Sequence, residues 1–192
     1  MNDQKTNRYK HEKGTIIVEV GVKKSRQLFN ERDPAPFRER DLDPQFVTYL
    51  VSAVEEFSIG TKMKIRIMTA DENDLKPENS VIISEAIQTY FKYESKLAQS
   101  KLHRRYRTAR NFFIIGSLTL MACLSVAQFM STIQSAPVVA KIVSEGFVII
   151  GWVAMWRPIE DLLYSWWPIR EQRLYFNKIA IMDVEVVAGP KT

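Results

Sequence analysis

The chain has 192 residues, 26% of them charged, a formal net charge of +5 and a single cysteine. This length fits one domain or slightly more, and one cysteine excludes a disulfide framework or a cysteine-based zinc site within one chain. The basic excess lies in residues 95–110, which hold six basic residues and no acidic one. This segment indicates contact with anionic lipid headgroups, at ~1 kcal/mol per Lys or Arg near the surface, rather than with nucleic acid.

The N-terminal third begins with a polar stretch, residues 1–14, which lacks an apolar core. We expect a disordered tail there that is neither a signal peptide nor a lipidation site. Residues 15–22 are rich in β-branched side chains, which is typical of a strand. The following connection, residues 23–42, is charged and contains prolines. Its Arg38 and Arg40 are partner-docking candidates because guanidinium groups bind carboxylates or phosphates in pairs; the alternative is a solvated loop with local ion pairs.

The pair Asp43-Pro44 has the form of a helix start, an N-cap acid followed by proline, and apolar residues recur at helical spacing up to Phe57. Residues 61–68 alternate basic and apolar side chains, which predicts a strand with one buried face. The basic side chains of this strand could bind anions, although a solvated outer face is the favoured interpretation. They are Lys62, Lys64 and Arg66.

A long helical pattern begins near Ser80 and meets no glycine or proline up to Phe113. The sequence allows either one helix of ~50 residues that runs into the next apolar segment or a break near Gln99, where the apolar stripe fades. Five basic side chains of this stretch are expected to contact lipid headgroups. They are Lys101, Arg104, Arg105, Arg107 and Arg110.

Two apolar segments, residues 112–130 and 137–156, are each long enough to cross a bilayer. The short uncharged connection between them predicts an antiparallel transmembrane hairpin over residues 111–157. The basic residues on its N-terminal side place both chain ends in the cytoplasm by the positive-inside rule.

Residues 158–177 carry aromatic and apolar side chains on one face, which predicts an interfacial helix after a proline turn. The residues expected to anchor the chain at the interface are Trp152, Trp156, Arg157, Tyr164, Trp166 and Trp167. Residues 178–192 contain a strand-like segment and a tail. Because two strands are rarely stable alone, we predict that this last strand joins the other two in one sheet, with the first two strands parallel through a right-handed crossover.

Lys141 and Glu145 lie inside the second predicted span. Glu145 falls ~16 Å from Trp156 along a helix axis, near the bilayer centre, where a charge costs at least ~2.5 kcal/mol. The simplest interpretation is that the two side chains pair with each other, or that the helix sits lower. The alternative is a functional role for Glu145 as a protonation site, a pore-lining group or a polar contact with another helix.

No catalytic, cofactor-binding or metal-binding motif is found in the sequence. Neither histidine belongs to a nucleophilic set, and no two glycines form a phosphate-binding spacing. A catalytic carboxylate pair is possible in principle among Asp33, Asp41 and Asp43, but the loop between them does not fix their geometry. We therefore expect no cofactor and no enzymatic activity.

Two segments resemble an uncharacterised family of small bacterial two-span membrane proteins. One is residues 151–170, GWVAMWRPIEDLLYSWWPIR, and the other is residues 33–44, DPAPFRERDLDP. The resemblance covers most of the chain and implies a bacterial inner-membrane protein. It implies no activity.

These patterns together predict an α+β membrane protein. A cytoplasmic α/β part, residues 15–110 with the C-terminal strand of residues 178–192, would have about three strands and a long helix leading into the hairpin. The expected function is a non-enzymatic membrane anchor or accessory subunit that binds an unidentified protein or forms a homo-oligomer. The alternatives are a small oligomeric channel or transport component that uses Glu145, and an enzyme at the membrane surface.

Overall fold

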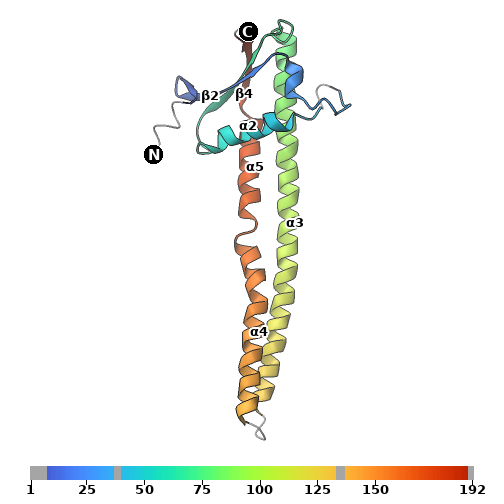
Figure 1. Cartoon of the computed structure of the whole chain (residues 1–192), viewed down its shortest axis with the longest axis vertical. Helices are drawn as coiled ribbons and strands as arrows, with labels where there is room; N and C mark the ends of the chain where they lie inside the picture. The colour runs from blue at the N-terminus through green and yellow to red at the C-terminus, as the bar shows by residue number, and fades with distance from the viewer. Residues whose placement is uncertain (1–7, 37–39, 133–136, 190–192) are drawn as a thin grey trace. The chain divides into compact units, whose positions relative to one another are not determined.

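The computed structural model describes residues 8–36, 40–132 and 137–189. The fold is α+β, with a four-stranded sheet and long apolar helices (Figure 1). The chain forms two compact units. We call Met1–Leu97 with Gln172–Thr192 the sheet unit, and Ala98–Glu171 the helical unit.

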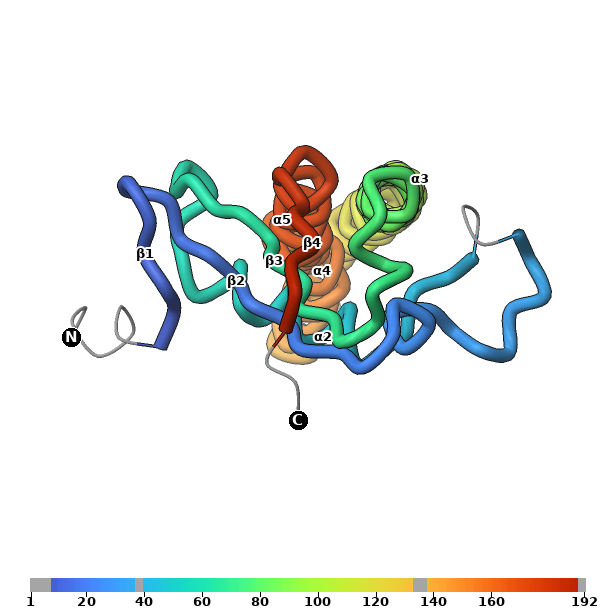
Figure 2. Tube along the Cα trace, turned by 90° about the horizontal axis from the view of Figure 1, so that it is seen from above, coloured from blue at the N-terminus to red at the C-terminus, as the bar shows by residue number. Residues whose placement is uncertain are grey.

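The sheet has the order β1-β2-β3-β4, as Figure 2 shows from above. Its strands are β1 (Lys10–Glu12), β2 (Thr15–Val22), β3 (Met63–Thr69) and β4 (Asp183–Ala188). β2 and β3 are parallel, as expected, and so are β3 and β4, with Ile65 opposite Val184. The prediction that the C-terminal strand joins the sheet is therefore confirmed.

The expectation of about three strands is wrong, because β1 forms within the stretch that we expected to be a tail. Lys13 and Gly14 both have positive φ, 48° and 77°, which suits a tight two-residue hairpin turn, and β1 pairs antiparallel with β2. The strand consists of exposed polar residues, so it has no apolar pattern. Ion pairs stabilise it instead, one of which joins Lys10 Nζ to Glu19 Oε1 at 2.9 Å.

The helices of the sheet unit cover one face of the sheet. They are η1 (Ser25–Leu28), α2 (Pro44–Glu55), the first part of α3 (Pro77–Ser131) and the last part of α5 (Trp167–Ala180). α2 begins where expected, because the Asp43 carboxylate accepts hydrogen bonds from the backbone N–H groups of Gln45 and Phe46 at 2.9 and 3.1 Å.

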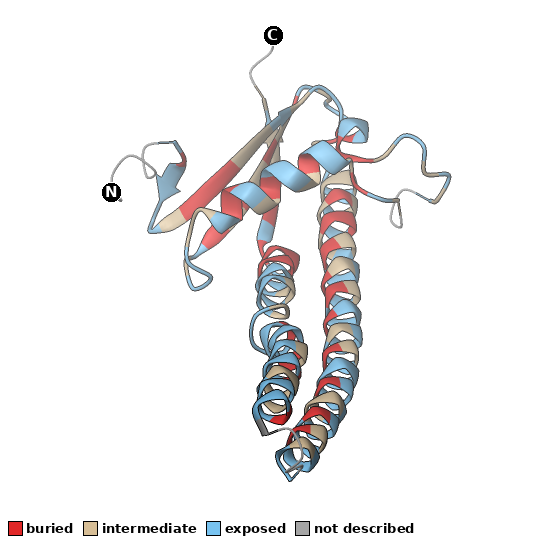
Figure 3. Ribbon diagram, turned by 60° about the horizontal axis from the view of Figure 1, so that its bottom comes forward, coloured by how far each residue is buried: buried red, intermediate tan, exposed pale blue. Residues whose placement is uncertain are grey.

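The core of the sheet unit joins residues that are far apart in the sequence (Figure 3). The ring of Phe91 on α3 lies 5.9 Å from that of Phe176 on α5. Fully buried side chains come from each layer, and they include Val18, Leu50, Ile65, Ile67, Ile87, Phe91 and Ile179. This core contains the alternating inner face of β3, in agreement with the predicted half-buried strand.

α3 is one helix of 55 residues, so the open question of a break near Gln99 is answered. α4 (Pro137–Leu163) also continues further than expected, through Pro158. The chain leaves the helical conformation at residues 164–166 and not at Pro158, where we expected a turn. α5 extends to Ala180, beyond the expected end at residue 177, and β4 therefore begins only at Asp183. The boundaries that we expected for a separate interfacial helix, residues 158–177, therefore do not correspond to a helix of the structure.

Gly116 on α3 provides the space that Pro158 needs inside α4. A Cβ atom at Gly116 would lie 2.9 Å from Pro158 Cγ and 3.3 Å from the carbonyl oxygen of Ala154. That carbonyl is the one that loses its intrahelical hydrogen bond to a proline four residues later. A missing side chain on the neighbouring helix therefore accommodates the proline ring.

Replacing Phe91 with alanine should destabilise the sheet unit by ~3–5 kcal/mol, because the ring is fully buried and its removal leaves a cavity. Pulse proteolysis in mild detergent at increasing urea concentration measures this change. The matched control is Val81→Ala, at a side chain on the same helix that is 54% exposed. Equal effects of the two substitutions would contradict the core described above.

Candidate functional site

The second half of α3 packs against α4 within the helical unit, and the two helices run antiparallel. Ser144 Oγ donates a hydrogen bond to the backbone oxygen of Ala127 at 3.0 Å. A Cβ atom at Gly151 would lie 2.8 Å from Leu120 Cδ1. Small residues therefore allow close approach along the seam, as in membrane helix pairs.

Away from this seam the apolar side chains of the two helices are uncovered. Two helical stretches are long and apolar enough to cross a membrane, and only 17% of the most apolar window of each is buried. The core helix of a soluble protein would be mostly buried. Strongly exposed apolar side chains include Leu118, Met121, Phe129, Val138, Ile142 and Val153.

A buried carboxylate links α3 and α4 just beyond the expected spans. Asp161, only 7% exposed, lies 3.2 Å from Arg105 Nη2 and 3.6 Å from Arg157 Nε. Ser165 Oγ donates to it at 2.7 Å. The Ser165 hydrogen bond and the two guanidinium groups hold the pKa of Asp161 below its ordinary value. The carboxylate thus stays ionised at neutral pH and joins the helices.

The expected headgroup and interface residues have different surroundings. Arg105 points to Asp161, whereas Lys101, Arg104, Arg107 and Arg110 are exposed. Trp166 is half-buried, stacked on Tyr106 at 6.0 Å, with the Arg170 guanidinium 5.6 Å from its ring centre. The remaining expected anchors are exposed, namely Trp152, Trp156, Arg157, Tyr164 and Trp167.

Lys141 and Glu145 on α4 are both exposed. No ion pair or hydrogen bond joins their side chains in the part of the chain that the structure describes. The interpretation that they neutralise each other therefore lacks support. The sequence did not single out a third polar group near these two residues, the exposed side chain of Gln128 on α3. Gln128 lies at a depth along the helix pair similar to that of Glu145. This depends on how α3 and α4 are aligned, which a short stretch of sequence does not show.

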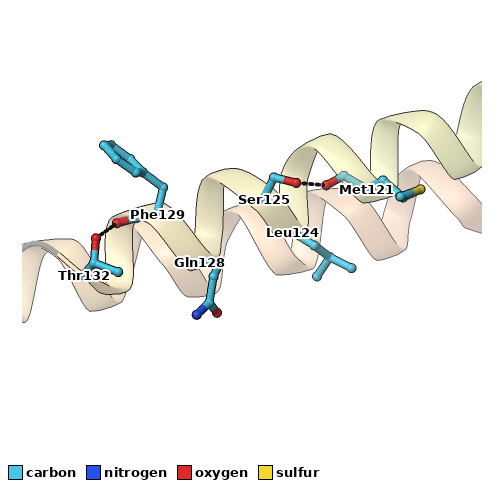
Figure 4. A pocket seen from close by; sticks show the side chains of 6 residues that line it. All are labelled: Met121, Leu124, Ser125, Gln128, Phe129 and Thr132. Carbon is cyan, nitrogen blue, oxygen red and sulfur yellow. Dashed lines mark hydrogen bonds between the residues drawn. The ribbon is translucent and has the colours of Figure 1, made fainter.

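Gln128 belongs to a shallow groove of ≈ 570 Å³ on the exposed side of α3 (Figure 4). The groove is lined by Met121, Leu124, Ser125, Gln128, Phe129 and Thr132. The hydroxyl groups of Ser125 and Thr132 donate to the carbonyl oxygens of Met121 and Phe129 at 2.8 and 2.7 Å. The Gln128 amide side chain forms no hydrogen bond with any residue that the structure describes.

The basic row of β3 is neutralised on the open face of the sheet. The Arg66 guanidinium forms a bidentate salt bridge with the Glu12 carboxylate, with N–O distances of 2.8 and 2.9 Å. Its Nη2 atom also lies 3.4 Å from Glu185 Oε2. Lys64 lies 2.8 Å from Glu185. Because Lys64 and Arg66 have carboxylate partners, their charges act mainly between strands, and the anion-binding interpretation loses its basis for these two residues. Lys62, the third basic residue of the predicted row, precedes β3 and is exposed.

The loop before α2 is closed at its base. Asn30 N–H donates to Asp41 O at 2.8 Å, and the Asp33 carboxylate accepts from the backbone N–H groups of Ala35 and Asp41. These two bonds lower the pKa of Asp33. Arg38 lies outside the described residues. The Nε atom of Arg40 is buried and has no hydrogen-bond partner among the residues that the structure describes.

Two of the three acidic residues considered for catalysis bind backbone groups through their carboxylates. Asp33 fastens the loop and Asp43 caps α2. Asp41 takes part in the loop through its backbone N–H and carbonyl groups. No group of His, Cys, Asp and Glu side chains with the geometry of a metal site occurs within residues 8–36, 40–132 and 137–189.

Two buried polar residues of the sheet unit were not singled out from the sequence. Asp74 accepts hydrogen bonds from Ser25 N–H, Ser25 Oγ and Thr69 Oγ1 at 2.7, 2.7 and 3.0 Å. Lys178 Nζ donates to Ser58 O at 3.0 Å, and burial lowers the pKa of this lysine. Both residues fix loops.

Replacing Asp161 with asparagine should lower the melting temperature of the detergent-solubilised protein at pH 7 by a few degrees. A carboxylate with a lowered folded pKa stabilises the fold above its unfolded pKa of ~3.9, and this contribution is lost as the pH falls through the folded value. The difference between wild type and variant should therefore vanish in acid. Glu160→Gln, at a neighbouring side chain that is 51% exposed, is the control and should change little. A pH-independent difference would contradict the role given to Asp161.

No family model matches the chain, and neither a curated protein nor a solved structure is similar to it. The family resemblance of residues 33–44 and 151–170 therefore stays a prediction.

Proposed function

We propose that the chain is an integral membrane protein that crosses the bacterial inner membrane twice, through residues 112–130 and 137–156, with both ends in the cytoplasm. The observation that carries this proposal is the uncovered apolar surface of the antiparallel pair. Burying apolar side chains away from water is favourable by ~25 cal/mol per Å², so this surface requires an apolar surrounding. The exposed basic residues of α3 support contact with anionic headgroups on the cytoplasmic side.

The proposed role is that of a membrane anchor or accessory subunit whose sheet unit binds a cytoplasmic protein. The carboxylates of Asp33 and Asp43 fasten a loop and cap α2, which supports a role without chemistry for these two residues. Residues 30–36, the first part of the loop before α2, lie away from the strands in Figure 2, and Arg40 near the end of this loop is partly exposed. We therefore assign partner docking to this loop.

The topology is tested with single cysteines in a Cys123→Ala background. Glu72→Cys and Ile181→Cys, both at exposed positions of the sheet unit, should react with a membrane-impermeant maleimide only after the membrane is permeabilised. Thr132→Cys, directly after the C-terminal end of α3, should react in intact spheroplasts. Labelling of residues 72 and 181 from opposite sides would rule out the hairpin.

The docking role is tested by copurification from mild detergent. Arg40→Ala should reduce recovery of the bound protein ~10-fold or more, because a hydrogen bond to a charged group contributes ~1.5–3 kcal/mol. Arg32→Ala, an exposed arginine of the same loop, is the matched control and should retain the partner. A wild-type chain that elutes alone would contradict the proposed function.

A further inference from the structure

Three polar side chains lie within about one helical turn of each other in depth in the helical unit. The hydrogen bond from Ser144 Oγ to Ala127 O places residues 144 and 127 side by side across the antiparallel pair. The next residues along the chain, Glu145 and Gln128, are therefore at nearly the same depth. Lys141 lies one helical turn from Glu145 on the same side of α4.

These groups are costly in lipid. A charge costs at least ~2.5 kcal/mol at the bilayer centre and less toward the interface, and an unpaired amide is also unfavourable in hydrocarbon. The register sets Glu145 opposite residue 126, ~6 Å from the end of the span 112–130, so Glu145 lies nearer the interface than the sequence alone predicts. All three side chains are exposed, and none forms a hydrogen bond or ion pair with another described residue of this chain. If the pair is inserted in a bilayer, these groups need partners from outside the chain at this depth.

The groove on α3 can bind a second helix that carries a polar partner for Gln128. Its walls are apolar, through Met121, Leu124 and Phe129, and its two hydroxyl groups are already bonded to carbonyl oxygens of α3 itself. The Gln128 amide is the polar group left to bond. An amide can donate to a carboxyl group and accept from an ammonium group, so it complements both Glu145 and Lys141.

We propose that the groove on α3 binds α4 of a second copy of this chain, with the second copy's Glu145 at the Gln128 amide. Copies inserted in the same orientation lie at the same depth, so α4 of one copy runs antiparallel to α3 of the next, as it does within one chain. The contact joins the α3 surface of one copy to the α4 surface of the next, which are two different surfaces. Such a contact repeats head to tail along a series of copies, and the series closes into a ring when the rotation between neighbours permits. This inference rests on the proposed membrane insertion.

Cross-linking between single-cysteine variants in a Cys123→Ala background tests the contact while Gln128 and Glu145 stay in place. Met121→Cys and Ile149→Cys are at exposed positions, 66% and 63%, and the helix register puts them at matching depths. We expect at least tenfold more cross-linked dimer in vesicles that hold both variants than in vesicles that hold either variant alone. Phe129→Cys, in the same groove but two turns away from the level of residue 149, is the control and should give little dimer with Ile149→Cys.

The polar contact is tested in the same assay. Glu145→Leu on the Ile149→Cys chain should lower the dimer yield at least tenfold, and Glu145→Gln should restore it, because glutamine can still bond to the amide. The proposal would be overturned if Ile149→Cys alone, or the pair of Phe129→Cys and Ile149→Cys, gave as much cross-linked dimer as the pair of Met121→Cys and Ile149→Cys. An absence of dimer in vesicles that carry the protein on flotation would overturn it too. Failure of flotation itself would overturn the membrane insertion and this contact together.

Discussion

The ladder between β3 and β4 is the contact on which the organisation of this chain depends. It pairs residues 64–69 with residues 183–188, so a strand near the C-terminus completes a sheet begun near the N-terminus. Everything between them, including the antiparallel helices, is inserted into the sheet unit. The sheet unit thus contains the segments on both sides of the helical pair. Because these segments fold together, they lie on the same side of any membrane that the pair crosses, and a two-helix hairpin satisfies this condition.

The two units bury their side chains in opposite ways. In the sheet unit, β3 directs Ile65 and Ile67 into a closed core, and its charged side chains lie on the open face, paired with carboxylates. In the helical unit, the small residues of the seam are covered and the large apolar side chains point outward. The first pattern suits water on the open face, and the second suits lipid around the pair. Asp161 lies beyond the apolar segments, where an ionised carboxylate between two arginines is tolerated.

Regular patterns predicted much of the fold. The Asp43-Pro44 start of α2, the alternation along β3 and the apolar periodicity of α3 each reflect contacts within one element, and each is visible in a short window. β1 could not be predicted in this way, because its residues are exposed and its stability comes from ion pairs with other strands. The passage of α4 through Pro158 depends on Gly116, 42 residues earlier in the chain.

The candidate site was predictable only in part. Lys141 and Glu145 stand out in the sequence because charge is unusual in an apolar run. Their lack of a partner within the described chain, and the presence of Gln128 at the same depth, depend on helix rotation and register. Likewise, the spacing of Arg157 and Asp161 fits one helical turn, but the contribution of Arg105 comes from the other helix.

The proposed membrane insertion requires lipid around the exposed apolar surface of the α3–α4 pair. Spin labels at Ile115 and Ile150, which are 60% and 55% exposed and lie away from both the groove on α3 and the Glu145 face of α4, measure this contact in reconstituted vesicles. If lipid covers the surface, both labels are relaxed strongly by oxygen and weakly by a water-soluble nickel chelate, whereas a label at Glu72 shows the reverse. Strong relaxation of residues 115 and 150 by the nickel chelate would rule out the insertion.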